Sequence, residues 1–396
     1  MRKVLVAGLS FWLSLSVLAS DLERKIAEQQ VAKALVLSDV FKARYKAISV
    51  LRNKYPKLYK AQKKTLDAEI DAFDMPRYVW QAIELMDKDA SGEAGFLAMK
   101  LISRQYPAIL PNGNQGDMPS LNPVQLGEVF TRLIDKALSE HIDNPNLIEV
   151  VGRPAFYLTS LPTYNIEAVY DYQKSVWSKI IEGSEHRSVK GTAAYLMADY
   201  AIKFTQISGL PEELKRQAKI DVATYSNMSI NEYGDVVVRN GKTAREIMGG
   251  RLFALDALVA GKELPDVEAK TLKGKLDQLS NYRGKVVLVD FWATWCGPCI
   301  ATFPAIAQLK KELAGKPFEV ISINVDDEVE DAIAFKENSE QPMPWVNWHI
   351  GPDSPILTEW AVNKYPTFFV LDEKGIIQIT DFDSNKIKEL VNKLAE

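Results

Sequence analysis

Residues 285–299 read KVVLVDFWATWCGPC, and this stretch decides the fold of the last third of the chain. Its first eight residues are almost continuously apolar, which is typical of a strand buried on both faces of a sheet. Pro298 stands where a helix would begin, and a helical pattern follows as far as Leu313. The stretch therefore predicts a buried strand, a tight turn that carries two cysteines, and a helix.

Cys296 and Cys299 are the only cysteines among the 396 residues. A disulfide that closes so small a loop constrains the unfolded chain very little, so a purely structural bridge is disfavoured. Redox chemistry and metal binding remain. A zinc site would need further ligands, but His141, His186 and His349 each lack a second ligand nearby in sequence. Redox chemistry is the interpretation that we prefer.

The rest of this region alternates strands with helices. Such alternation, closed by an antiparallel pair, predicts an α/β sandwich with a central mixed sheet. We expect a hairpin at 267–271 and 275–277, later strands at 318–325, 345–350, 367–371 and 376–380, helices at 328–337 and 355–362, and a last helix capped by Ser384.

Residues 289–299 resemble the active-site strand and turn of the thioredoxin superfamily almost letter for letter. Residues 364–369, KYPTFF, are similar to the cis-proline segment of that family. The segments GKELPD (261–266) and NYRGK (281–285), and the extra helix and strand between 325 and 366, resemble the extracytoplasmic TlpA/ResA branch. The resemblance covers residues 262–396. It implies a thioredoxin-like fold, thiol-disulfide oxidoreductase activity and no bound cofactor or metal.

This resemblance assigns roles to the motif residues. Cys296 would attack a substrate disulfide, because the partial positive charge and free N–H groups of a helix N-terminus favour its thiolate. Cys299 would then resolve the mixed disulfide, which leaves a redox-active Cys296–Cys299 disulfide. Gly297 and Pro298 keep the turn tight and are also expected to contact the substrate. Because no histidine stabilises the thiolate further, the motif favours a reductant.

Asp290 stands where the family carries a buried carboxylate near the resolving sulfur. Desolvation would raise its pKa, which suits a general base for Cys299. Thioredoxins usually carry a lysine on the neighbouring strand, but Ser322 occupies that position here. The alternative is a buried aspartate without a catalytic part.

Three further residues are expected at the substrate surface. Pro366 would be cis and face Cys296, and Tyr365 would offer backbone groups to an extended substrate peptide. Trp295 would flank the dithiol as an apolar landing surface, whereas Trp292 would pack beneath it.

Residues 21–261 are predicted to be helical, in sub-regions 21–145 and 160–261. Asp74-Met75-Pro76 resembles a capped helix start, and further helices fit 93–106, 123–138 and 166–181. The longest connections are 107–123 and 144–163. A helix at 189–207 and another after Pro211 resemble a tetratricopeptide (TPR)-like hairpin. Small residues would allow these helices to cross closely: Ala194, Ala198, Ala218 and Ala223. A last helix is expected at 243–259.

Residues 1–20 are typical of a secretory signal peptide. Arg2 and Lys3 precede an apolar run at 4–18, and Ala19-Ser20 would form the cleavage point. The run is short for a bilayer span of ~20 residues, but an uncleaved anchor is the alternative. We expect a protein exported to a bacterial periplasm or another extracytoplasmic compartment and soluble after cleavage. A net charge of -4 offers no basic surface for nucleic acid.

The leading hypothesis is an exported thiol-disulfide oxidoreductase that reduces protein disulfides and receives electrons from a membrane thiol carrier. A disulfide oxidase or isomerase would carry the same motifs. A different alternative is a helical interaction or scaffold protein with a redox-sensing module, whose helices bind a partner or self-associate. A peroxiredoxin is disfavoured, because Val289 and Ala293 stand where it would need a proline and a threonine.

Overall fold

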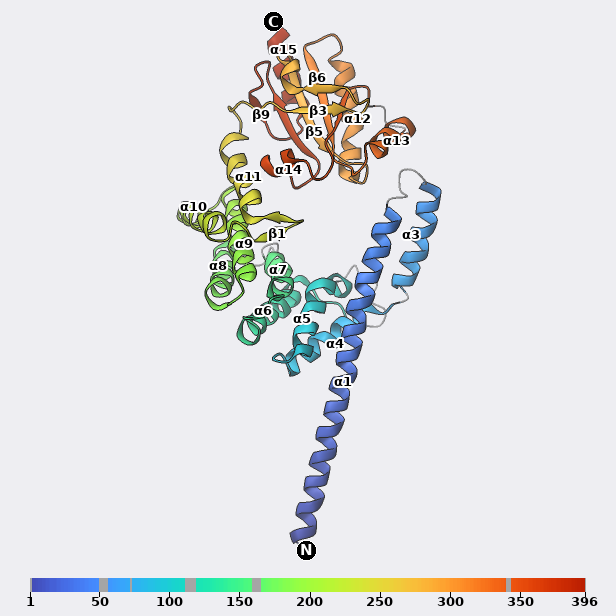
Figure 1. Cartoon of the computed structure of the whole chain (residues 1–396), viewed down its shortest axis with the longest axis vertical. Coiled ribbons are helices and arrows are strands. Elements are labelled where there is room, and N and C mark those ends of the chain that lie inside the picture. The colour runs from blue at the N-terminus through green and yellow to red at the C-terminus, as the bar shows by residue number, and fades with distance from the viewer. Residues whose placement is uncertain are drawn as a thin grey trace. The chain divides into compact units, whose positions relative to one another are not determined.

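The computed structural model describes residues 2–49, 56–71, 73–110, 119–158, 165–339 and 343–395. It forms two compact units, one of residues 1–48 and 61–244 and the other of residues 49–60 and 245–396. The first is helical and the second contains a seven-stranded sheet (Figure 1). The predicted succession of a helical region and a thioredoxin-like α/β sandwich is confirmed. Parts of the two expected long connections, 111–118 and 159–164, lie outside the described residues.

The helical part of the chain closely matches the predicted helices.

No helix within the described ranges combines the length and the apolar character that crossing a membrane requires. The elements are α1 (Arg2–Ser49), α3 (Pro56–Asp71), α4 (Met75–Lys88), α5 (Glu93–Gln105), the 3-10 turn η1 (Tyr106–Ile109), α6 (Pro123–Glu140), α7 (Leu147–Leu158), α8 (Ile166–Gly183), α9 (Arg187–Thr205), α10 (Glu212–Asn227), the π turn η2 (Met228–Glu232), β1 (Val237–Arg239) and β2 (Lys242–Thr243).

Helix α7 corrects the sequence analysis, which placed residues 144–163 in a connection. Pro154 lies inside this helix, where it removes a backbone hydrogen bond at a cost of ~3 kcal/mol. The helix persists because Val150, Val151 and Ala155 are fully buried on its inner face. Burying the two valine side chains contributes up to ~1.5–3 kcal/mol each, so packing outweighs the local cost of the proline.

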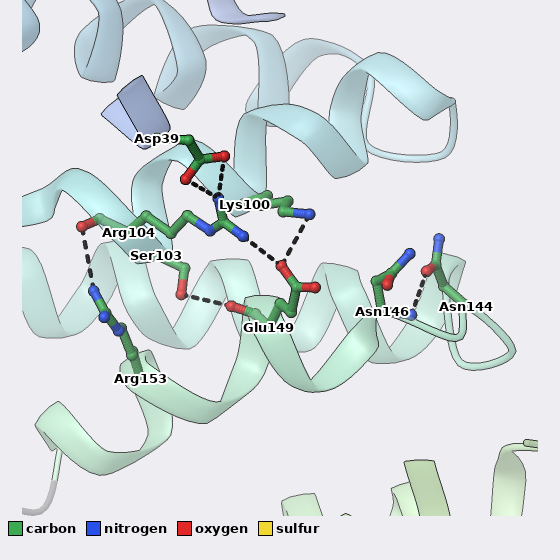
Figure 2. Close-up of polar contacts among 8 residues, drawn as sticks. All are labelled: Asp39, Lys100, Ser103, Arg104, Asn144, Asn146, Glu149 and Arg153. Carbon is green, nitrogen blue, oxygen red and sulfur yellow. Dashed lines mark hydrogen bonds and ion pairs between the residues drawn. The ribbon is translucent and has the colours of Figure 1, made fainter. Parts of the chain in front are cut away.

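Arg104 links three helices of the helical unit (Figure 2). From α5, its guanidinium donates to Asp39 of α1 at 3.2 Å and to Glu149 of α7 at 2.7 Å. Lys100 lies 2.9 Å from the same Glu149 carboxylate, and Ser103 donates to the Glu149 carbonyl at 3.1 Å. Ion pairs this exposed stabilise little individually. Together they join α1, α5 and α7 through one polar cluster.

Helix α9 packs against both α8 and α10 (Figure 1). Ala194, Ala198 and Ala218 are fully buried, as expected of residues where helices cross. Ala223 is exposed, so its expected place in that crossing is wrong. The inner face of α10 follows Ala218, Asp221 and Tyr225 at steps of three and four residues, which turns Ala223 outward.

The second unit is built on a mixed sheet of order β4-β3-β7-β6-β5-β8-β9. β5 pairs in parallel with β6 and antiparallel with β8, and β6 pairs in parallel with β7. The elements are α11 (Ala244–Ala257), β3 (Glu268–Thr271), β4 (Leu276–Gln278), the 3-10 turn η3 (Leu279–Tyr282), β5 (Val286–Trp292), α12 (Gly297–Glu312), β6 (Phe318–Asn324), α13 (Val329–Asn338), β7 (Val346–His349), α14 (Pro355–Glu359), β8 (Thr367–Leu371), β9 (Ile377–Ile379) and α15 (Ser384–Ala395).

Strand β5 is buried along its whole length, as its apolar run predicted. Alternate side chains of a strand point to opposite faces. Trp292 contacts Phe303 of α12 with ring centroids 5.2 Å apart, whereas Phe291 contacts Trp360 just after α14 at 6.0 Å. Asp290 shares the face of Trp292 and therefore points to the side covered by α12.

The second unit begins before the predicted boundary at Gly261. A Cβ on Gly250 of α11 would lie 1.9 Å from the Thr358 carbonyl oxygen of α14, so the two helices pack at backbone distance. Gly261 N–H donates to the carbonyl of Ile377, and Ile377 N–H donates to that of Lys262, both at 2.8 Å. Gly261, with φ +89°, is a turn inside this unit rather than a linker.

The last helix is capped by a different residue from the predicted one. The backbone N–H groups of Asn385 and Lys386 donate to the Asp383 carboxylate at 2.9 and 3.0 Å. Ser384 is the first helical residue, so its assignment as the cap is wrong.

Candidate active site

Cys296 and Cys299 form a disulfide with a Cα–Cα distance of 5.3 Å. Cys296 is the N-cap of α12, and the Cys299 N–H donates to Cys296 Sγ at 3.2 Å. Pro298 lies in the first turn of this helix, where its missing N–H costs nothing. In the reduced protein the same N–H and the helix dipole would favour a thiolate on Cys296.

Both cysteines are shielded from solvent. Cys299 is fully buried, and Cys296 is only 4% exposed in this disulfide-bonded state. Gly297, Pro298 and the side chain of Trp295 form the exposed part of the turn, and Trp295 is 53% exposed. The surface open to a substrate is therefore this rim rather than the sulfur itself.

The predicted proline segment lies beside this turn. The Tyr365–Pro366 peptide bond is cis, as predicted. The rings of Tyr365 and Trp295 meet edge to face with centroids 5.6 Å apart. Trp292 is fully buried, as predicted for a residue beneath the turn. The structure thus brings Trp295, Tyr365 and Pro366 together at the dithiol, and their part in substrate binding stays a prediction.

Asp290 is fully buried on β5. It lies opposite Ser322 in the parallel β5–β6 register, and Ser322 Oγ donates to Asp290 Oδ2 at 3.1 Å. Burial raises the pKa of Asp290 to about 7, against a smaller opposing effect of the Ser322 hydrogen bond. Oδ1 has no hydrogen-bond partner among the described residues. The raised pKa suits the predicted proton acceptor, although that role is untested.

Sequence reasoning missed Trp345, which donates a hydrogen bond to Ser322, the partner of Asp290. Its indole Nε1 donates to Ser322 Oγ at 2.8 Å, and its side chain is almost fully buried. The sequence analysis assigned Trp345 only to a strand. No sequence signal indicates this contact, because it depends on how the strands align.

Asp326 was also missed. Its carboxylate accepts hydrogen bonds from both the N–H and the hydroxyl of Thr294, two residues before Cys296, and from the Asn324 amide. Burial raises its pKa, and these hydrogen bonds oppose the rise. A signal did exist, because Asp326 follows β6 and the carboxyl ends of adjacent parallel strands meet at one edge. Asp326 holds the start of the active-site turn.

Comparisons with known proteins converge on this unit. Residues 260–380 match the family model described as the AhpC/TSA family. Thioredoxin-like protein YneN from Bacillus subtilis (strain 168) is 36% identical over 137 residues, which are 34% of this chain and 78% of that protein. Thiol-disulfide oxidoreductase ResA from Geobacillus thermodenitrificans (strain NG80-2) is 30% identical over 122 residues, 31% of this chain and 68% of that protein.

A solved structure, a thiol-disulfide oxidoreductase from Bacteroides fragilis NCTC 9343, is 26% identical and covers 33% of this chain and 99% of its own, with a TM-score of 0.30. The residues that match the family model include the Cys296–Cys299 disulfide at a helix N-terminus. The chain therefore belongs to the thioredoxin-like thiol-disulfide oxidoreductases, with YneN and ResA among its relatives.

Proposed function

We propose that this oxidoreductase is an exported reductase of protein disulfides that works through its Cys-Gly-Pro-Cys motif, residues 296–299. The observation that carries the proposal is the position of the Cys296–Cys299 disulfide. It lies at the start of α12, directly after Trp295, whose exposed ring contacts the ring of Tyr365. Apolar rings and free backbone groups beside a dithiol suit an extended segment of a protein substrate.

The reaction starts from the reduced pair. The Cys296 thiolate attacks one sulfur of the substrate disulfide, forms a mixed disulfide and releases the other substrate sulfur as a thiolate. Cys299 then loses its proton and attacks Cys296 Sγ, which releases the second substrate sulfur. The substrate gains two electrons and the enzyme is left with the Cys296–Cys299 disulfide. A dithiol donor must reduce this disulfide before the next turnover.

Asp290 is the proposed acceptor of the Cys299 proton. It lies on the face of β5 that α12 covers, and Cys299 occupies the first turn of α12. A base is most effective when its pKa lies near the working pH, and the pKa of Asp290 is about 7. Cys296 has the helix N-terminus to favour its thiolate, so the buried Cys299 needs the base more.

Reduction is the favoured direction because no histidine lies between the cysteines to stabilise the reduced form strongly. We expect a reduction potential nearer to the value of roughly -270 mV found for thioredoxin than to roughly -120 mV for a strong oxidant. Titration against glutathione measures it, and a value above about -150 mV would move the assignment to a disulfide oxidase.

The proposal includes export and a membrane-embedded thiol carrier as the electron donor. Arg2 and Lys3, followed by the apolar run at 4–18, support export. An oxidising compartment would require such a donor. N-terminal sequencing of the mature protein tests this part: cleavage predicts a first residue Asp21, whereas an intact N-terminus in the membrane fraction would indicate an anchor.

Two single substitutions test the exchange mechanism. Cys296→Ser should abolish reduction of a model protein disulfide such as that of insulin. Cys299→Ser should trap the mixed disulfide, because the first attack still occurs without resolution. The mechanism is wrong if Cys299→Ser traps nothing and Cys296 resists alkylation at neutral pH.

The helical unit is proposed to hold the protein substrate or a partner. The paired helices α8, α9 and α10 support this idea, because stacked helical hairpins form surfaces that bind peptides or proteins. Self-association is the alternative. Light scattering on the full chain decides between them when it is combined with substrate kinetics: a dimer whose kinetics match those of the isolated sheet-containing unit would leave only self-association.

A further inference from the structure

Ser322 lies between a group that can only donate a hydrogen bond and a group that accepts one when ionised. An indole N–H has no acceptor site, so Ser322 Oγ must accept from Trp345 Nε1 at 2.8 Å. A serine hydroxyl has a single hydrogen, and Asp290 Oδ2 lies 3.1 Å away to receive it. The direction of both hydrogen bonds therefore follows from chemistry alone.

Burial keeps this arrangement free of competition from water. Ser322 and Asp290 are fully buried, and Trp345 is 5% exposed. The Trp345 ring also meets Phe303 of α12 edge to face, with centroids 6.3 Å apart, which restricts its rotation. A hydroxyl held from one side by a fixed donor cannot turn its hydrogen away from the carboxylate without leaving a buried group unpaired.

The surroundings of Asp290 contain no described charged side chain that affects its ionisation. Its neighbours across the sheet are Ser322 on β6 and Phe368 on β8. By the strand register, His349 of β7 and Lys270 of β3 share this face of the sheet, and the two cysteines lie at the start of α12. Burial raises its pKa, and the Ser322 hydrogen bond is the smaller, opposing effect. The Ser322 hydroxyl therefore occupies the position where the thioredoxin pattern has a lysine cation.

We infer that Ser322, oriented by Trp345, is a positioning residue that occupies Asp290 Oδ2 and reserves Oδ1 as the oxygen that takes the proton from Cys299. The inference rests on the proposed function of Asp290 and assigns that function to one atom. Oδ1 is the buried oxygen without a hydrogen-bond partner among the residues described. Cys299 S–H gives its proton to Oδ1, which leaves a thiolate and a neutral carboxylic acid. The acid later returns the proton to the departing substrate thiolate, so no net charge is created.

The test compares four single substitutions in the full-length chain. Ser322→Ala removes the hydroxyl, Ser322→Thr keeps it, and Trp345→Phe removes only the N–H that orients it. Ser103→Ala is the matched control, because Ser103 is also fully buried and hydrogen-bonded but belongs to the helical unit. Two quantities are measured: the titration of the Asp290 carboxyl by NMR in the oxidised protein, and the pH profile of mixed-disulfide resolution.

Loss of a hydrogen bond to the carboxylate favours its protonated form. Ser322→Ala should therefore move the Asp290 titration upward by about one pH unit, a tenfold change in the ratio of carboxylate to acid. Resolution should slow about fivefold at pH 7, because the carboxylate fraction falls from about one half to about one eleventh, and should recover at high pH, while attack by Cys296 stays unchanged. Trp345→Phe should act in the same direction but less. Ser322→Thr keeps the hydroxyl and should therefore keep the wild-type Asp290 titration and pH profile of resolution. Ser103→Ala should match the wild type in both measurements.

An unmoved Asp290 titration in both Ser322→Ala and Trp345→Phe would overturn the inference, as would slowed resolution that persists at high pH. If Ser322→Ala does not fold, Trp345→Phe decides by the same two measurements. The NMR titration needs no turnover, so it separates two failures. A wild-type protein that exchanges no disulfide would end the proposed function. Normal exchange with an unmoved titration would end this inference alone.

Discussion

Asp290→Asn should stabilise the folded protein in a way that depends on pH. The pKa of Asp290 is about 7 in the folded state, against an ordinary value of 3.8. Because the folded state holds the proton more tightly, this group's contribution to stability is fully present below about pH 4 and is lost as the pH rises through 7. The difference of about three pH units, at 1.36 kcal/mol each, corresponds to about 4 kcal/mol at pH 8 and above.

The assay is urea unfolding of the oxidised full chain at a series of pH values from 5 to 9. The quantity of interest is the unfolding free energy of Asp290→Asn minus that of the wild type. Any cost of leaving the new amide N–H unpaired is the same at every pH, so it shifts the curve without changing its slope. The difference should rise by about 3 kcal/mol between pH 5 and 8 and then level off.

A matched control separates this effect from general changes in charge. Asp353→Asn removes an exposed carboxylate of the same unit, so its curve should be flat over this range. A flat difference for Asp290→Asn, or one that falls as the pH rises, would refute the raised pKa. The base role proposed for Asp290 would fail with it.

Three further predictions address packing and assembly. Gly250→Ala should destabilise the second unit by about 1–3 kcal/mol in urea unfolding, because its Cβ would overlap α14. Gly249→Ala, with no atom within 4 Å of the added Cβ, should not destabilise it. A fragment that begins at Arg245 should fold and reduce a small model disulfide. One that begins at Lys262 should unfold at a lower urea concentration. Equal urea midpoints for the two fragments would contradict a second unit that starts at Arg245. Asp326→Asn should lower the free energy of unfolding by ~1–3 kcal/mol, because hydrogen bonds to the active-site turn are lost. An unchanged urea midpoint would show that Asp326 does not stabilise this turn.

Most strands and helices were predicted correctly, because the signals that start, end and bury them lie within a few residues of each other in the sequence. The apolar run of β5 and the proline at the start of α12 are examples, and the resemblance to thioredoxins supplied the topology. The failures have a common cause. The domain boundary was placed at Gly261, residues 144–163 were assigned to a connection, and Ala223 was assigned to a helix crossing. In each case long-range packing, which periodicity does not contain, decided the outcome.

The candidate site divides in the same way. Cys296, Cys299, Tyr365 and Pro366 were named from motifs, and the structure places the last two beside the turn that carries the cysteines. Asp290 and Ser322 were compared by family position, but their hydrogen bond needed the register of two parallel strands. That register comes from pairing between distant segments, and local sequence patterns do not reveal it.

The backbone pairing of Gly261 and Lys262 with Ile377 also matters for solubility. Strand β9 ends its side of the sheet, and an uncovered edge strand offers unpaired N–H and C=O groups to any passing chain. Two hydrogen bonds to Ile377, and a further one from Leu264 N–H to the Gly375 carbonyl at 3.0 Å, cover part of this edge. The segment that leads into the sheet therefore also protects it. A protein cut within this segment would expose a template for edge-to-edge aggregation, even though its dithiol would be intact.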